Sequence, residues 1–168
     1  MLILEYTSPC GKLLLSVHGN SLVLCDWMVE GRIEKTLRRI RKYLPSPVWE
    51  DNTDIFVLAG RQLDEYFAGI RKEFDLPLLP LGTDFQLQVW DALMSVSYAR
   101  TVSYKTIAEA VCRSSSVRAV ANAIGANPLS ILIPCHRIIG TDGTLTGYAG
   151  GLETKRYLLE LENKYGSR

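Results

Sequence analysis

The segment Asp75-Leu76-Pro77-Leu78-Leu79-Pro80-Leu81-Gly82 divides the chain into two halves with different sequence patterns. Each proline lacks the backbone N–H that a helix interior needs and disfavours helical geometry in the residue before it. We therefore predict an extended linker at residues 77–83, between an N-terminal domain at 1–76 and a C-terminal domain at 84–168. The 168 residues suffice for two small domains that each bury a core.

The half before the linker begins with strand-like runs separated by turn residues, at 2–7, 12–18 and 21–27. These runs predict a three-stranded antiparallel meander, and Gly19-Asn20 is typical of a tight hairpin turn. Two helices are expected to follow. The first, at 33–43, is basic and only weakly amphipathic, and the second spans 55–67.

The half after the linker has a helical pattern. Thr83 and Gln86 form a capping box that predicts one helix start, and Ser103 marks a second. A third helix is expected to begin near Ser116, with Gly125 just beyond its C-terminal end. Because a short polar turn at 113–115 joins the second and third helices, the pattern indicates a helix-turn-helix.

On the third helix, Arg118 and Asn122 face away from the apolar stripe, flanked by Ala119 and Ala123. Small residues there would let the helix backbone approach a groove closely, although a solvated surface arginine explains Arg118 equally well. Residues 92–141 hold five basic residues and one acidic residue, a local balance of +4 within a chain of net charge +1. That stretch could seat phosphates, or it could be a solvated face. The charged residues are Arg100, Lys105, Glu109, Arg113, Arg118 and Arg137.

Composition places the chain among globular proteins, with 47% hydrophobic and 22% charged residues. No apolar run approaches the ~18 residues of a membrane span, and the N-terminus reads as a strand instead of a signal peptide, so a cytoplasmic location is expected. The four cysteines lack Cys-x-x-Cys spacing, which favours reduced thiols. Cys10, Cys25 and Cys112 are expected to be small buried residues, and a zinc site through Cys10, His18 and Cys25 is a weaker alternative.

Pro134-Cys135-His136-Arg137 sets a thiol beside an imidazole. The thiolate is the nucleophilic form, and a free cysteine with pKa near ~8.5 is only slightly ionised at neutral pH, so it needs a base. Neighbouring side chains on extended backbone point to opposite faces, so the pair can cooperate only through a turn, a bridging water or a third group. In the predicted last helix, at 152–164, Glu162 lies beside the apolar stripe. If Glu162 is buried, its carboxylate needs a partner, and His136 and Lys155 are the two candidates. If it is not buried, Glu162 is a surface residue at a frayed helix end.

Several motifs in this order and spacing resemble the O6-alkylguanine-DNA alkyltransferase family. The resemblance covers residues 85–162, about half of the chain, and is weaker before the prolines, where Ser8-Pro9-x-Gly11 carries it. The motifs are Phe85-Gln86-x-x-Val89-Trp90, Ser103-Tyr104-x-x-Ile107-Ala108, Arg118-Ala119-Val120, Asn127-Pro128, Ile133-Pro134-Cys135-His136-Arg137-Ile138-Ile139 and Gly147-Tyr148-Ala149-Gly150-Gly151-Leu152-x-x-Lys155, continuing through Leu158-Leu159 to Glu162.

The resemblance implies an α+β protein with an N-terminal ribonuclease-H-like sheet with helices and a C-terminal, mostly helical, winged-helix-like domain that contains the helix-turn-helix. It implies direct-reversal DNA repair: the protein flips an O6-alkylated guanine out of the duplex and moves the alkyl group irreversibly onto Cys135. Its partner would be double-stranded DNA carrying that lesion. The protein would act once, as a monomer, without a metal or organic cofactor.

The resemblance also implies roles for single residues. His136 would act as a base through a water molecule and be oriented by Glu162, in the manner of a catalytic triad. Arg118 would fill the place of the flipped base from the minor groove. Tyr104 would press on the phosphate and donate a hydrogen bond to the leaving guanine. Asn127 would pin the turn between the recognition helix and the active site.

The remaining implied roles concern the pocket. Backbone groups near Cys135 and Ile138 would read the base edge, and a loop at 148–150 would cover the pocket with the Ala149 amide near O6. The resemblance also places Gly150 and Lys155 among the residues that form or support the pocket. Some family members carry serine at the position of Ala149, so only a backbone donor remains here. The Gly-Tyr-Ala-Gly-Gly loop is similar to the constitutive bacterial branch, which would admit bulkier adducts or O4-alkylthymine.

Three other functions fit parts of the sequence. A non-catalytic lesion sensor of the same fold would lack the reactive cysteine, which is present here. A helix-turn-helix regulator should carry several base-reading polar side chains, but Ala119 and Ala123 leave too few. A cysteine hydrolase would need a substrate cleft and an oxyanion site that the sequence does not indicate.

Overall fold

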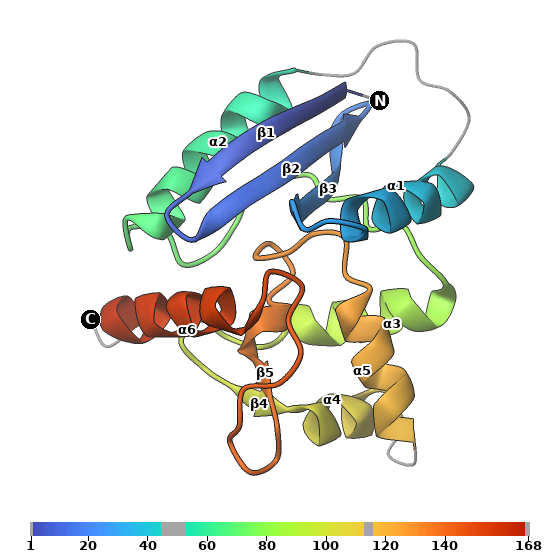
Figure 1. Cartoon of the computed structure of the whole chain (residues 1–168), viewed down its shortest axis with the longest axis vertical. Helices are drawn as coiled ribbons and strands as arrows, with labels where there is room; N and C mark the ends of the chain where they lie inside the picture. Colours follow the sequence, from blue (N-terminus) through green and yellow to red (C-terminus); the bar gives the residue numbers. More distant parts are fainter. Residues whose placement is uncertain (1, 45–52, 113–115, 167–168) are drawn as a thin grey trace.

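The computed structural model describes residues 2–44, 53–112 and 116–166. It has the predicted α+β class: a sheet with its helices in the N-terminal half packs on a mostly helical C-terminal half (Figure 1). Within the described ranges, none of the helices is long and apolar enough to cross a membrane. The predicted polar turn at 113–115 lies outside the described residues.

The sheet is the predicted meander of three antiparallel strands, β1 (Leu2–Ser8), β2 (Gly11–His18) and β3 (Ser21–Trp27), in that order. The pairing of His18 with Ser21 leaves Gly19 and Asn20 as a two-residue turn, as expected. Gly19 adopts a φ of 58°, which glycine reaches without steric cost.

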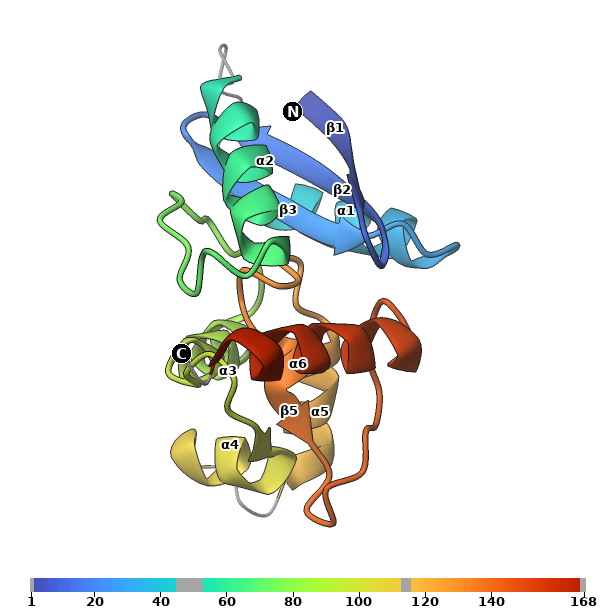
Figure 2. The same cartoon turned by 90° about the vertical axis from the view of Figure 1, so that its left-hand side faces the viewer.

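Both faces of the sheet are covered. Helix α2 (Asp54–Phe67) packs on one face through Phe56 and Leu63, while α1 (Arg32–Tyr43) and the segment at 79–81 pack on the other through Ile40 and Leu81 (Figure 2). Every residue of β3 after Ser21 is therefore buried, without the alternation of a half-exposed strand. The expectation that α1 is only weakly amphipathic is wrong, because its apolar side packs closely on the sheet.

The C-terminal half is built around short helices. Its elements in chain order are α3 (Asp84–Met94), β4 (Val102–Ser103), α4 (Tyr104–Ala110), α5 (Val117–Gly125), a 3₁₀ turn (Cys135–Arg137), β5 (Ile138–Ile139) and α6 (Leu152–Gly166). The capping box at Thr83 and Gln86 forms as predicted, and the Ser103 side chain caps α4. Gly125 was expected just beyond the end of α5, but it is the last helical residue and Ala126 is the cap.

The linker is extended, as predicted, but it docks on the sheet. Leu22 N donates to Pro77 O at 2.8 Å, and Leu79 N donates to Leu22 O at 2.9 Å, so Leu78 pairs in parallel with β3. Farther along the same strand, Cys25 N donates to Pro128 O at 2.9 Å. Strand β3 therefore binds both the linker and the segment that follows α5. The domain boundary itself stays a prediction.

One hydrophobic core runs through both halves of the molecule. Helix α6 crosses beneath the sheet and α2, between the upper and lower parts (Figure 2). The shared cluster includes Leu13 from β2, Tyr66 from α2, Trp90 from α3 and Leu158 from α6. Because the halves bury apolar surface against each other, residues from the sheet side can hold parts of the site described below.

Candidate active site

Cys135 opens the 3₁₀ turn and is held by Asn127. The Asn127 Nδ2 atom donates to Cys135 Sγ at 3.2 Å and to Ile133 O at 2.9 Å, while Asn127 Oδ1 accepts from Leu129 N at 2.9 Å. Asn127 thus ties the segment that follows α5 to the thiol. Burial raises the pKa of the Cys135 thiol, since the side chain is 5% exposed, and the Asn127 hydrogen bond opposes that shift only partly.

His136 is fully buried beside a carboxylate. Its Nε2 atom lies 2.7 Å from Glu162 Oε1. Burial lowers the pKa of His136, against the opposing effect of Glu162, so the imidazole is neutral at pH 7. If Nε2 carries the proton that Glu162 accepts, Nδ1 carries the lone pair. Nδ1 is buried and has no hydrogen-bond partner among the described residues.

Glu162 is the centre of a buried network. Arg137 donates to it from Nε at 3.0 Å and from Nη2 at 2.9 Å, and Tyr66 Oη and Ala99 N donate at 2.8 Å and 3.0 Å. Burial would raise the pKa of Glu162, but hydrogen bonds and charges from His136 and Arg137 outweigh it and lower the pKa to about 2. The carboxylate therefore remains ionised and fixes the imidazole.

Lys155 is not the partner of Glu162, so that alternative is wrong. Its Nζ atom donates to Thr146 O at 2.8 Å and also to Ile138 O. Burial lowers the pKa of Lys155 to about 8. Lys155 joins α6 to β5 and to the loop before α6, which is a positioning role.

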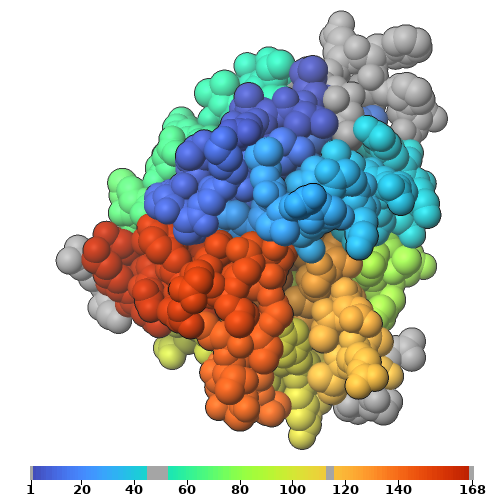
Figure 3. Space-filling view, viewed as in Figure 1, coloured from blue at the N-terminus to red at the C-terminus, as the bar shows by residue number. Residues whose placement is uncertain are grey.

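A groove of about 800 Å³ lies beside this network, between α5 and the loop at 146–149, with Tyr104 of α4 in its wall. Figure 3 shows α5 and the segment before α6 facing each other across this part of the surface. Cys135 is not part of the groove wall. It interacts electrostatically with two wall residues, Tyr104 and Tyr148, and burial raises the pKa of both phenols.

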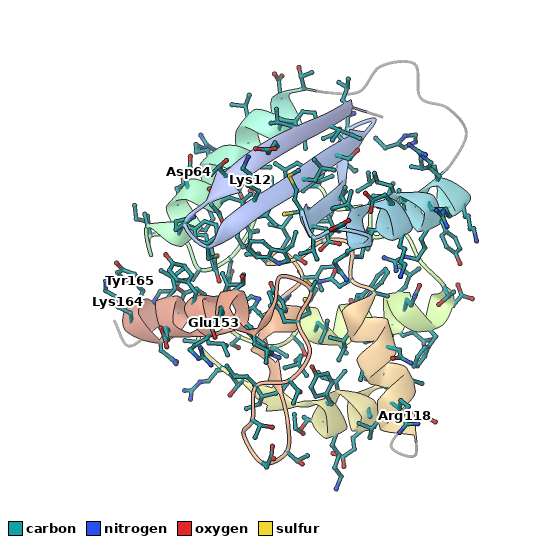
Figure 4. The ribbon with its side chains drawn as sticks, viewed as in Figure 1. Lys12, Asp64, Arg118, Glu153, Lys164 and Tyr165 are labelled. Carbon is teal, nitrogen blue, oxygen red and sulfur yellow. The ribbon has the colours of Figure 1, made fainter. Side chains whose placement is uncertain are left out.

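The exposed face of α5 differs in one position from the expectation. Arg118 projects outward at the start of the helix (Figure 4), and Ala119 and Asn122 are also exposed. Ala123 was expected on this face, but it is 3% exposed and packs in the core, and its carbonyl accepts a hydrogen bond from Trp90 Nε1 at 2.8 Å. The half-buried Ala121 takes its place in the groove wall.

The loop before α6 is tied from two sides. Tyr104 Oη donates to Thr146 O at 3.1 Å, and Trp27 Nε1 of β3 donates to Tyr148 Oη at 3.0 Å. Gly147 and Gly151 adopt positive φ at the two ends of the Tyr148 segment. A β-carbon at Gly150 would lie 2.8 Å from the Trp27 ring, so only glycine fits there without displacement.

Other predictions are changed by the structure. The basic stretch at 92–141 offers less surface charge than its count suggests, because Arg137 is buried on Glu162 and Lys105 lies 3.9 Å from Glu109; Arg113 lies outside the described residues. Cys112 is exposed and Cys10 is partly exposed, so only Cys25 is buried as expected. In the part of the chain that the structure describes, no cluster that could hold a metal forms, so the zinc alternative is unsupported.

Sequence reasoning missed the contributions of the N-terminal half. Tyr66 sits in an apolar helix stripe that gives no sign of its bond to Glu162. Asp26 of β3 is fully buried; it accepts a hydrogen bond from Ser130 Oγ at 3.0 Å and forms an ion pair with Arg32, whose Nε lies 2.9 Å from Asp26 Oδ2. An acidic residue within an apolar strand was the one available signal. Ala99 has a φ of 58°, which is strained for a residue other than glycine, and this turn aims its N–H at Glu162.

Helices α4 and α5 beside a groove, together with a buried cysteine followed in sequence by a histidine that is bonded to a carboxylate, are typical of a DNA-binding protein with a reactive cysteine. The family model for the 6-O-methylguanine DNA methyltransferase DNA-binding domain matches residues 84–164, and the model for the ribonuclease-like domain of the same family matches 3–80. The chain belongs to this family.

Relatives match over nearly the whole chain. The methylated-DNA–protein-cysteine methyltransferase of Methanosarcina barkeri is 44% identical over 155 residues, 92% of each chain. The Haemophilus influenzae protein of the same name is 41% identical over 160 residues, 94% of this chain and 83% of its own. Crystal structures of Mycobacterium tuberculosis O6-methylguanine methyltransferase and of Mycobacterium tuberculosis OGT in complex with DNA superpose with TM-scores of 0.80 at 40% identity; they cover 97% and 96% of this chain, and 93% and 92% of their own.

Proposed function

We propose that this protein repairs DNA by direct reversal, taking an alkyl group from O6 of guanine in a duplex onto Cys135. The observation that carries the proposal is the buried turn in which Asn127 holds Cys135 Sγ while His136 is fixed on Glu162, beside a groove walled by the recognition helix α5. The activity named for the relatives is the same transfer.

The transfer is a displacement at the alkyl carbon. The S–C bond forms as the O6–C bond breaks, and the thiol proton passes through a water molecule to His136 Nδ1. That nitrogen suits the role because it is buried, neutral and without a partner among the described residues. Guanine leaves with the bonding electrons, and a hydrogen bond from Tyr104 to a ring nitrogen stabilises the charge that it gains. The proton held by His136 then passes through water to the released guanine, so the step balances. The thioether is a poor leaving group, so each molecule reacts once.

Recognition of the lesion requires the base to leave the duplex. Flipping costs a few kcal/mol, about the scale that an inserted side chain can offset. Arg118 suits insertion because it projects from the exposed face of α5 (Figure 4). In this proposal the loop at 147–151 lies over the bound base, and Gly147 and Gly151, which have positive φ at its two ends, are the hinges that let a purine enter. The Ala149 amide is the proposed donor to O6.

The regulator alternative is disfavoured by α5, since Arg118 and Asn122 are the only polar side chains on its described surface. A lesion sensor is disfavoured by the Cys135 arrangement itself. Activity on O4-alkylthymine, a monomeric state and a cytoplasmic location remain part of the proposal.

The test of the transfer is mass spectrometry after incubation with a duplex containing O6-methylguanine. We expect one added methyl group on Cys135 in the wild-type protein and in Cys112→Ala, which removes an exposed thiol away from the site. Cys135→Ala should lose transfer and keep affinity for the alkylated duplex. An unmodified wild-type protein after long incubation would refute the proposal.

Arg118→Ala tests the flipping role. It should slow repair in duplex DNA by at least about tenfold, the effect of losing roughly 1.4 kcal/mol of support for the flipped state. The rate with free O6-alkylated guanine base should stay unchanged, because a free base needs no flipping. Equal slowing of both reactions would remove this role from Arg118.

A further inference from the structure

Helix α1 carries an unusual concentration of positive charge. Of its 12 residues, six are basic and one, Glu34, is acidic. Like charges three and four residues apart on a helix repel each other, so the fold alone gives no reason for this pattern. The basic residues are Arg32, Lys35, Arg38, Arg39, Arg41 and Lys42.

Two of these residues fix α1 against the recognition helix. Arg32 donates from Nη1 to Gly125 O at 3.0 Å and from Nη2 to Asn127 O at 3.2 Å. Arg39 donates to Ala126 O. These carbonyls lie at the C-terminal end of α5, where the helix dipole favours cations. Helix α1 is therefore held in a fixed position beside α5.

The other four basic residues are exposed. In the described ranges, none of them lies within ion-pair distance of a carboxylate, whereas the exposed Lys12, Arg61 and Arg156 all do. Lys35, Arg38 and Lys42 fall at i, i+3 and i+7, so they form one stripe along α1. The three cations of this stripe form no ion pair with any carboxylate of the described residues, so they are available to bind an anionic partner.

The stripe adjoins the groove of the active site. A second hollow, of about 540 Å³, lies between α1 and α5, with Lys35 in one wall and Asn122 in the other. It shares Arg32, Asn122, Gly125, Tyr148 and Ala149 with the first groove, so the two are continuous. Figure 3 shows α1 next to α5 on one face of the molecule.

We propose that α1 is a second DNA-contact element, in which the stripe Lys35, Arg38 and Lys42 binds backbone phosphates of the duplex whose damaged base enters the first groove. The inference rests on the proposed function and extends it to the N-terminal half. Phosphate contacts carry no sequence information, so the stripe would bind damaged and undamaged duplex equally. An anionic membrane is disfavoured as the partner because the stripe continues the groove of the recognition helix.

The test compares two double variants with equal loss of charge. Lys35→Gln with Arg38→Gln removes two cations of the stripe, and Arg61→Gln with Lys164→Gln removes two from α2 and α6; Figure 4 labels Lys164 at the C-terminal end of α6, away from α1. Binding to an undamaged duplex of about 20 base pairs is measured by fluorescence anisotropy at several salt concentrations.

For the α1 variant we expect several-fold weaker binding near ~0.1 M salt, and a plot of log affinity against log salt that is shallower by about 1 to 2. The α2/α6 variant should keep the wild-type slope. Both variants should react with free O6-alkylguanine base at the wild-type rate, which shows that the active site is intact.

Equal slopes for the two variants would overturn the inference. It would also be overturned if the α1 variant kept normal DNA binding and lost binding to vesicles of anionic phospholipid. Failure of the proposed function is seen separately, because the wild-type protein would then not react with the free base, whatever the slopes are.

Discussion

The carboxylate of Glu162 binds three side chains that come from other parts of the sequence. It fixes His136, neutralises Arg137 and accepts from Tyr66 of the sheet-side half. The arrangement keeps one negative and one positive charge buried together and leaves the imidazole uncharged. A neutral imidazole with its second nitrogen free is the form in which it can accept a proton.

The lowered pKa of His136 gives a prediction about pH. Below pH 6.5 the unfolded chain binds a proton at His136 that the folded protein excludes, so stability from this group is complete above 6.5 and is lost as the pH falls below it. Glu162, with a pKa of about 2, adds a loss that begins below its ordinary value of 4.5. Both effects make the folded protein sensitive to acid.

The rate of transfer should follow the same group. With free O6-alkylguanine base as substrate, we expect the single-turnover rate to change little as the pH falls from 7.5 toward 6.5, because the pKa of His136 is lowered from its ordinary value, and to fall at lower pH. Quenched single-turnover assays across pH 5 to 8 measure the transfer rate, and chemical denaturation at each pH measures the free energy of unfolding. A rate that halves near pH 7 would contradict the assignment of His136 as the base.

At the scale of elements, the loop before α6 depends on its contact with β3. Gly150 packs directly on the ring of Trp27, which is itself bonded to Tyr148. In Gly150→Ala, the new methyl group would lie under 3 Å from a buried ring, so the loop must shift. We expect a loss of about 1 to 3 kcal/mol in the free energy of unfolding, the usual cost of overpacking, and slower alkyl transfer.

The matched control is Gly60→Ala in α2, where a β-carbon meets no atom within 4 Å. Alanine there should raise the free energy of unfolding by about 0.5 to 1 kcal/mol, because glycine is the poorer helix former. Urea denaturation gives both values. Equal effects of the two substitutions would show that the contact with Trp27 does not constrain the loop.

At the scale of the whole molecule, Arg32 joins the two halves through hydrogen bonds to backbone carbonyls of the C-terminal half. Arg32 of α1 forms an ion pair with the buried Asp26 of β3 in the same half. It also donates to the carbonyl of Gly125, the last residue of the recognition helix, and to that of Asn127, which in turn holds Cys135. The N-terminal half thus supports the nucleophile through two intermediates, in addition to its contacts through Tyr66 and Trp27.

Arg32→Met should destabilise the protein by about 3 to 5 kcal/mol, since it leaves the Asp26 carboxylate buried without a counter-charge. Asp26→Asn combined with Arg32→Met removes the stranded charge and should recover part of that loss. Thermal and urea unfolding of the single and double variants measures the difference. A double variant no more stable than Arg32→Met would mean that the hydrogen bonds of Arg32 to the α5 end matter more than its charge.

Local patterns in the chain were enough to predict the meander, the starts of α3 and α4 and the extended linker, because turn residues, caps and proline act over a few residues. Cys135, His136 and Arg118 could also be named from the sequence, because each stands in a short local pattern of this kind. The pattern placed Ala123 on the exposed face of α5, and this was wrong, because packing against Trp90 buries that residue.

Contacts between distant segments lay beyond such patterns. Three contacts depend on how the halves pack through their shared core: the choice of His136 over Lys155 as the partner of Glu162, the bond of Tyr66 to Glu162, and the position of α1 against α5. The burial and the shifted pKa values at those contacts exist only in the folded protein. The residues next to each of these side chains in the sequence do not indicate which distant residue it will contact.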